Sequence, residues 1–152
     1  SDDEWKLRLA KQEMDEKARI ALEMFTADKV TCGEQQPESD HFANVANSVN
    51  GDNDGRHWRR TRNEGWFSYV MNPKGKTIQH IRIVCQGQEG NEATVLVNGV
   101  EAGNFRTMTP GNEEMHLVPV PAEQQNADLM TITIKGIEGK STPMIYEVRL
   151  SL

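Results

Sequence analysis

The chain has 152 residues, of which 36 % are hydrophobic and 26 % charged, a size and composition that favour one compact domain and argue against wholesale disorder. Its 17 basic and 23 acidic residues give a net charge of −6, the wrong sign for a protein that binds nucleic acid by neutralising phosphates. No apolar stretch approaches the roughly 20 residues of a membrane span, and the acidic first residues lack the basic and apolar regions of an export signal.

The first 26 residues predict one long amphipathic helix. There is no Gly or Pro between Asp2 and Thr26, and apolar residues recur there at spacings of three and four. This stripe consists of Leu7, Ala10, Met14, Ala18, Ala21 and Phe25. The expected i,i+4 ion pairs are Glu4 with Arg8, Glu13 with Lys17, and Asp15 with Arg19. Because an apolar stripe needs a surface to lie on, we expect the helix to pack along its own domain or a neighbouring one, with a self-associating coiled coil as the alternative.

The segment from Gly33 to Gly65 is rich in Gly, Asn, Asp, Glu and Gln and has no sustained hydrophobic period. It predicts a long ordered loop with short strands, and loops of this length are usually functional or interfacial. Within it, residues 50–55 place oxygen-bearing side chains at alternate positions, as at the start of a calcium loop, but a full calcium-loop pattern is missing. We therefore expect a solvated turn, with a calcium ion at Asp52 and Asp54 as the weaker alternative.

A basic cluster with one Trp follows, from Arg56 to Arg62. Because guanidinium groups bind carboxylates and an indole stacks on sugars or guanidinium groups, the cluster is suited to an acidic surface, a glycan or a neighbouring domain. The alternative is an internal ion network within the same long loop. Its candidate acidic partners are Glu34, Glu38 and Asp40. The aromatic run that begins at Trp66 is expected to be mostly core, since half of the rings in a strand face inward.

From Trp66 onward, short alternating patterns predict strand after strand, separated by turn residues and without a second long helix. The expected strands are Trp66–Met71, Ile78–Cys85, Thr94–Val97, Val100–Phe105, Glu114–Val120, Leu129–Lys135 and Met144–Leu152. Asn98-Gly99 suits the type I′ turn of a tight hairpin, and Pro73 to Lys76 indicates a hairpin or meander corner. The fold class is therefore mainly β: a two-sheet sandwich of jelly-roll or galactose-binding-like type behind one long N-terminal helix.

Three of these strands assign specific side chains to a buried face. The expected inward sets are Ile81, Ile83 and Cys85; Met130, Ile132 and Ile134; and Met144, Tyr146, Val148, Leu150 and Leu152. Cys85 is thus better explained as a small buried hydrophobe than as the partner of Cys32 in a disulfide.

No residue pattern in the chain indicates catalysis. The four histidines are isolated, and there is no metal-ligand spacing, no GxSxG motif and no phosphate-binding Gly-rich loop. His80 and His116 lie among strand residues and are expected to be surface or satisfied sheet residues. We therefore expect no catalytic residue and no cofactor, calcium apart.

Several segments together resemble a known family. They are Asp28 to Thr31, the string GEQQPESDH from Gly33 to His41, Trp58-Arg59, Gly65 to Tyr69 and the ending Ile145 to Leu150. They resemble the C-terminal accessory β-sandwich of bacterial glycoside hydrolases of the β-L-arabinofuranosidase family, over residues 30–152. In that family the chemistry belongs to an (α/α)₆ barrel, where a cysteine nucleophile is held on zinc by further cysteines and a glutamate. This chain resembles no part of that barrel, so no catalytic residue carries over.

The resemblance implies a noncatalytic module of a larger carbohydrate-degrading enzyme that is periplasmic or secreted, with a connector helix at residues 1–29 and a sandwich at 30–152. The module is expected to pack on the catalytic barrel of the same polypeptide. The candidates for contact with the barrel or with a glycan are Glu34, Gln35, Asp40, His41, Arg56, Trp58, Arg59 and Trp66. The alternative function is a carbohydrate-binding module that recognises a plant-type or host glycan through exposed rings of Trp58, Trp66 and Phe67. A third and weaker one is an independent enzyme that uses surface carboxylates.

Overall fold

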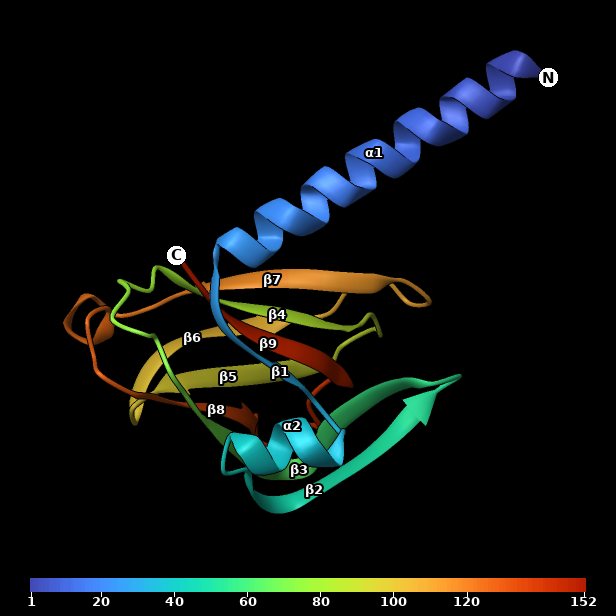
Figure 1. Cartoon of the computed structure of the whole chain (residues 1–152). Coiled ribbons are helices and arrows are strands. Elements are labelled where there is room, and N and C mark those ends of the chain that lie inside the picture. The colour runs from blue at the N-terminus through green and yellow to red at the C-terminus, as the bar shows by residue number, and fades with distance from the viewer.

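Nine strands form the body of the protein in the computed structural model, which describes all residues, 1–152 (Figure 1). The helices are α1 (Asp2–Met24), α2 (Gln35–Asp40) and the short 3₁₀ helix η1 (Ala122–Gln124). The strands are β1 (Thr26–Thr31), β2 (Asn44–Asn53), β3 (Arg56–Met71), β4 (His80–Gln86), β5 (Glu92–Val97), β6 (Val100–Arg106), β7 (Glu113–Pro119), β8 (Met130–Gly136) and β9 (Ile145–Ser151).

The strands form two antiparallel layers, which confirms the predicted two-sheet sandwich. One layer has the order β6-β5-β8-β3-β2, and the other has the order β7-β4-β9-β1. A single bridge between Arg59 of β3 and Ile145 of β9 joins the layers, so the sandwich is one continuous sheet folded over on itself. The division into residues 1–29 and 30–152 stays a prediction; strand pairing with β9 begins at Thr26.

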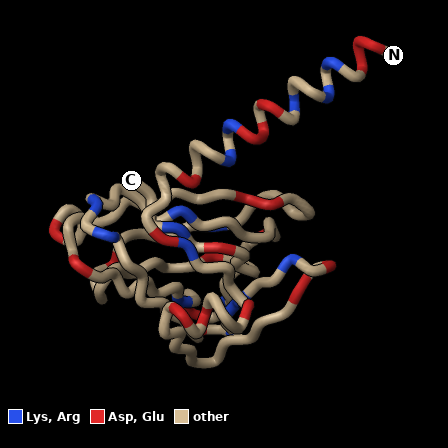
Figure 2. The backbone as a smooth tube through the Cα atoms, in the orientation of Figure 1, with Lys and Arg blue, Asp and Glu red and all other residues tan.

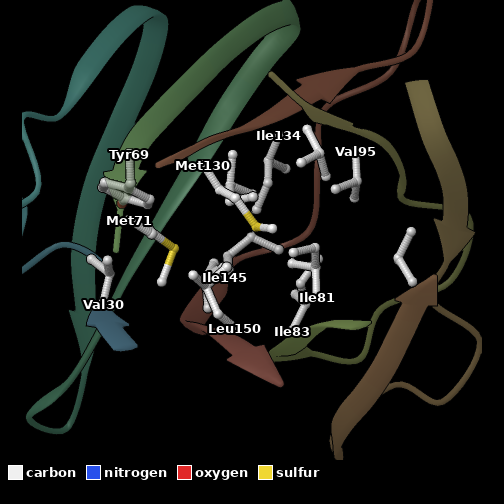
Figure 3. Close-up of a cluster of buried hydrophobic side chains, with 14 of the residues drawn as sticks. Val30, Tyr69, Met71, Ile81, Ile83, Val95, Met130, Ile134, Ile145 and Leu150 are labelled. Atoms are coloured by element: carbon white, nitrogen blue, oxygen red, sulfur yellow. The ribbon is translucent and has the colours of Figure 1, made fainter. Parts of the chain in front are cut away.

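The inner faces of the two layers enclose a core of 22 buried residues (Figure 3). All three predicted inward residues of β4 and all three of β8 are fully or almost fully buried. The β5–β6 hairpin is also confirmed, because Asn98 and Gly99 adopt φ values of +49° and +78°, as a type I′ turn requires. Cys32 and Cys85 are both buried and free. The period of two therefore predicts the core wherever one face of a strand is buried.

In β9 the predicted alternation is wrong at one point. Ile145, Val148 and Leu150 belong to the core cluster, whereas Tyr146 points away from it and bonds Gln86 through its hydroxyl. The pairing of β9 with β4 skips one residue of β9, which is a β-bulge. The bulge moves the residues before it to the opposite face, so Met144 and Tyr146 do not share a side with Val148.

The segment predicted as a long loop is mostly strand. Residues 44–71 form the long β2–β3 hairpin, whose tip at Asp54-Gly55 has positive φ at both residues. Because β2 is an edge strand with no fully buried residue, it shows no hydrophobic alternation in the sequence. The turn at Pro73 to Lys76 is not a hairpin either, since β3 and β4 do not pair and the turn carries the chain from one layer to the other.

α1 confirms the predicted long helix but not its packing. Ser1 and Glu4 form a capping box at its start, and no residue of the helix is buried. The helix projects from the sandwich, with charges of both signs along it (Figures 1 and 2). The expectation that its apolar stripe packs along its own domain is therefore wrong. The ion pairs also differ from the predicted ones and join Lys11 to Asp15 and Glu16 to Arg19. No helix of the chain combines the length and apolarity that crossing a membrane needs.

The alternation in β8 gives a direct test of the core. Replacing Ile132, which is fully buried, with Ala should lower the free energy of unfolding by about 3 kcal/mol, because a cavity forms between the layers. The matched control is Thr133→Ala on the outer face of the same strand, which should change stability by about 1 kcal/mol or less. Urea unfolding measures both, and equal effects would show that the two faces of β8 are misassigned.

Candidate functional site

The resembling segments meet on one side of the sandwich, where α2 lies against β1, β2 and β3 (Figure 1). We call this region the polar flank. It is defined by Asp28 of β1, Glu38 and His41 at α2, Ser48 of β2, and Arg59 and Tyr69 of β3. Four of the eight predicted contact residues border α2, and two more lie on the facing part of β3. The sequence string that carries the resemblance is thus a structural unit.

Glu38 is the centre of the polar flank. Its Oε2 and Oε1 atoms accept hydrogen bonds from Arg59, from Nε at 2.7 Å and from Nη2 at 2.8 Å. The Tyr69 hydroxyl donates to the same carboxylate at 2.5 Å, and Nη1 of Arg59 donates to the Ser48 hydroxyl at 3.1 Å. The side chains of Glu38 and Arg59 are only 9 % and 11 % exposed. This is a bidentate buried ion pair that fastens α2 to the hairpin.

The charges of the flank compensate one another. Burial favours a neutral Glu38, but hydrogen bonds from Arg59, Tyr69 and the Gly33 backbone outweigh it, so the pKa of Glu38 lies below its ordinary value of 4.5. Burial raises the pKa of the Cys32 thiol to about 12 and also raises the pKa of the Tyr69 phenol. Cys32 and Tyr69 are therefore protonated at neutral pH, and the network offers no activated nucleophile.

His41 attaches the end of α2 to β1. Its Nε2 atom lies 3.0 Å from Oδ1 of Asp28, and its Nδ1 atom lies 2.7 Å from the carbonyl oxygen of Pro37. The same aspartate accepts a hydrogen bond from the backbone N–H of Asn72 at 2.8 Å. Both ring nitrogens are thus engaged within the protein, so His41 serves to position α2.

Trp58 is half-buried and fills the space over two glycines. Gly33 has a φ of +81°, and a Cβ atom there would overlap the carbonyl oxygen of Trp58. A Cβ atom on Gly51 would lie 2.5 Å from the indole ring. The indole Nε1 atom is buried without a hydrogen-bond partner. The ring therefore packs on Gly51 of β2, and the backbone of Trp58 packs on Gly33 before α2, so Trp58 is not an open platform for a sugar.

Arg56 lies outside the polar flank, at the tip of the β2–β3 hairpin. Its guanidinium pairs with Glu113 of β7, with Nε 2.9 Å from Oε1. The guanidinium carbon, Cζ, lies 4.6 Å from the centre of the Tyr146 ring. At the same tip, Asp52 accepts a hydrogen bond from the Gly55 N–H at 2.9 Å, which closes the turn. No three His, Cys, Asp or Glu side chains converge closely enough to hold a metal ion. A calcium ion at Asp52 and Asp54 stays a prediction.

The remaining predicted residues are separated. Glu34 precedes α2 without a side-chain capping bond, and Gln35 and Asp40 are exposed on the helix. Trp66 lies half-buried on the outer face of β3, opposite Lys135 of β8. Phe67 is fully buried, so its proposed role as a stacking ring is wrong. The structure pairs Arg59 with Glu38, as the internal-network interpretation predicts.

Phe42 is the residue that sequence reasoning missed. α2 ends in a Schellman motif, in which Ala43 N–H donates to the Glu38 carbonyl at 3.0 Å and Phe42 N–H donates to the Ser39 carbonyl at 3.1 Å. This motif places Phe42 at a φ of +52°, where glycine is usual, and leaves its side chain 74 % exposed. Neither burial nor backbone preference explains a phenylalanine here. A helix of six residues is too short for its end to be recognised in the sequence.

Removing Arg59 tests the ion pair of the flank. Arg59→Ala leaves Glu38 buried without its counter-charge, so the free energy of unfolding should fall by about 3 kcal/mol. Arg62→Ala, at an exposed position of the same strand, is the control and should change it by less than about 0.5 kcal/mol. Denaturant unfolding of both variants would refute the assignment if the two losses were equal.

The lowered pKa of Glu38 makes a separate prediction for acid. Its stabilisation is complete above about pH 4.5 and is lost as the pH falls through the lower pKa of the folded state. Glu38→Gln should therefore be less stable than the wild type at pH 7, with a smaller further loss between pH 4.5 and pH 3. Glu123→Gln, at an exposed site, should keep the wild-type slope. A wild-type slope in Glu38→Gln would contradict the prediction.

Three solved structures share this fold. A family 35 carbohydrate-binding module from Clostridium thermocellum is 15 % identical, with a TM-score of 0.56, and the match covers 80 % of this chain and 95 % of that one. A GH26-CBM35 β-(1,4)-mannanase from Podospora anserina is 12 % identical, with a TM-score of 0.57 and coverage of 82 % and 28 %. The exo-β-1,3-galactanase of Phanerochaete chrysosporium, solved with β-1,3-galactotriose, is 11 % identical, with a TM-score of 0.53 and coverage of 82 % and 29 %.

These likenesses establish the β-sandwich fold, and this chain spans less than a third of either enzyme. No curated protein matches the sequence. Residues 21–151, which include the whole sandwich and the last turn of α1, match a protein family. The chain belongs to that family, the family of unknown function DUF6805.

Proposed function

We propose that this chain is the noncatalytic accessory β-sandwich of a larger carbohydrate-degrading glycoside hydrolase of the β-L-arabinofuranosidase type. In this proposal the module packs on the helical catalytic barrel of the same polypeptide, which is periplasmic or secreted. Residues 1–29 act as the connector and residues 30–152 as the module. The shared sandwich fold, found in two enzymes as less than a third of their length, supports an accessory role. The resemblance of the GEQQPESDH string supports the type of enzyme.

The exposed Phe42 carries the proposal. A phenylalanine with positive φ costs roughly 1 kcal/mol relative to an ordinary backbone conformation, and 74 % exposure means that its ring gains little from burial. Val45 nearby is also 44 % exposed, and Gln35 and Asp40 are exposed on the adjoining helix. An aromatic anchor with a polar rim is the usual anatomy of a protein interface. We therefore assign Phe42 to the contact with the barrel.

α1 supports the same assignment. Its apolar stripe is open to solvent, with Leu7 and Met14 each 71 % exposed and Phe25 58 % exposed. Most helical stability in proteins comes from a buried apolar face, and none of the 23 residues of this helix is buried. The all-helical barrel that the resemblance implies provides apolar surface of the kind that packs on such a stripe. Self-association of α1 is the competing prediction.

Phe42→Gly separates a structural role from an interface role. In the isolated chain it should raise the free energy of unfolding, by up to about 1 kcal/mol, because glycine adopts positive φ without strain. In the full parent enzyme the same change should lower the melting temperature and accelerate proteolysis at the connector, because the anchor is lost.

Lys74→Gly is the matched control, since Lys74 has a φ of +54° in an exposed turn. It should stabilise the isolated chain and the parent enzyme alike. If Phe42→Gly also stabilised both to the same extent, Phe42 would have no docking role and the proposal would be contradicted.

Glycan binding by the chain itself is a second candidate function. Trp66 favours it: the ring is partly exposed on the outer face of β3 and stands opposite Lys135, which lines a surface cleft. Glycan binding and docking use different residues, so each can be tested while the other is left intact.

A further inference from the structure

We infer that the cleft over β8 and β5 binds one unit of a neutral glycan, which extends from the cleft over the ring of Trp66 on the neighbouring strand β3. This inference rests on the second function proposed above and adds the site and the ligand class. The cleft has a volume of about 310 Å³, which is at the lower end of the range for small-molecule sites. It is lined by Glu64, Thr94, Leu96, Glu101, Lys135, Gly136, Ile137 and Glu138, and we call it the outer cleft.

The position of the outer cleft follows from strand register. Trp66 of β3 pairs with Lys135 of β8, which pairs with Thr94 of β5. The neighbouring residues Phe67 and Ile134 belong to the core, so Trp66, Lys135 and Thr94 alternate to the outer face. Side chains directly opposite on adjacent strands have Cβ atoms about 5 Å apart. The indole of Trp66 therefore stands one strand away from the centre of the cleft.

The polar groups of the outer cleft are free to bind. Glu64, Glu101, Glu138 and Lys135 form no ion pair and no side-chain hydrogen bond within the protein, in contrast to Glu92 of the same layer, which pairs with Lys140 at 2.7 Å. Unpaired carboxylates accept strong, charge-assisted hydrogen bonds from hydroxyl groups. The polar face of a sugar supplies such hydroxyls, and its C–H face packs on an indole. The cleft and the neighbouring Trp66 ring together offer the two kinds of contact that a sugar needs.

The charge of the outer cleft restricts the ligand. Three glutamates and one lysine leave a net charge of −2, which repels a uronate or a sulfated sugar. The three glutamates do not converge into a group that could hold a metal ion. A neutral saccharide is therefore the ligand class that fits the cleft.

The test is a titration of the whole chain, uniformly ¹⁵N-labelled, with three neutral probes and one acidic probe. The neutral probes are β-1,3-galactotriose, β-1,4-mannotriose and an oligosaccharide of L-arabinofuranose; the acidic probe is trigalacturonate. We expect at least one neutral probe to shift amide signals of residues 64–66, 94–96 and 135–138, and trigalacturonate to leave them unchanged. Glu101→Gln and Trp66→Ala should each weaken binding about tenfold or more. Glu123→Gln, outside the cleft, and Phe42→Gly, on the flank, should bind as the wild type does.

The outcomes distinguish the site from the function. If the shifts were confined to the polar flank and unaffected by Glu101→Gln and Trp66→Ala, the sugar site would not be the outer cleft. Glycan binding would then stand as a function of the chain. No shift with any neutral probe at 10 mM, or shifts with trigalacturonate alone, would overturn the inference together with neutral-glycan binding. Because Glu101 is exposed, its variant keeps the test decisive even if Trp66→Ala fails to fold.

Discussion

The buried ion pair between Glu38 and Arg59 holds α2 and the turn that follows it against the β2–β3 hairpin. α2 has six residues and is too short to be stable without tertiary contacts. The ion pair and the Tyr69 hydroxyl hold its middle, and the contact of His41 with Asp28 holds its end. These contacts hold the Schellman turn in place, so Phe42 keeps its positive φ and its exposed ring. In our account, contact with the catalytic domain compensates for this backbone strain.

The proposed contact with the catalytic barrel at Phe42 and the proposed sugar site at the outer cleft lie at different points along β3. The carbonyl of His41, next to Phe42, accepts a hydrogen bond from the backbone N–H of Val70, whereas the proposed sugar site begins at Trp66, four residues and about 13 Å away along the strand. One module can thus contact a catalytic domain at one end and a sugar at the other. The noncatalytic proposal is consistent with the chemistry of the polar flank. There Cys32 and Tyr69 keep their protons, and the ionised carboxylate of Glu38 is paired with Arg59.

The sequence predicts those parts of the fold in which a strand has one buried face. β4, β5 and β8 show a period of two because one face of each packs on the core, and Asn98-Gly99 marks its hairpin without ambiguity. β2 has no buried face, so its strand character is not visible in the sequence. The bulge in β9 depends on how β9 pairs with β4, which no local pattern encodes.

The candidate site was predictable only in part, for related reasons. The ion network was one of two interpretations of the Arg56–Arg62 cluster, and three acids were equivalent as partners until the structure selected Glu38. Phe42 became visible only through its backbone conformation. Hydrogen–deuterium exchange of the isolated chain and of the full parent enzyme tests the docking account most directly. The account predicts that amides of α1 and of the turn at Phe42 exchange quickly in the isolated chain and are protected in the parent; equal exchange in both would contradict it.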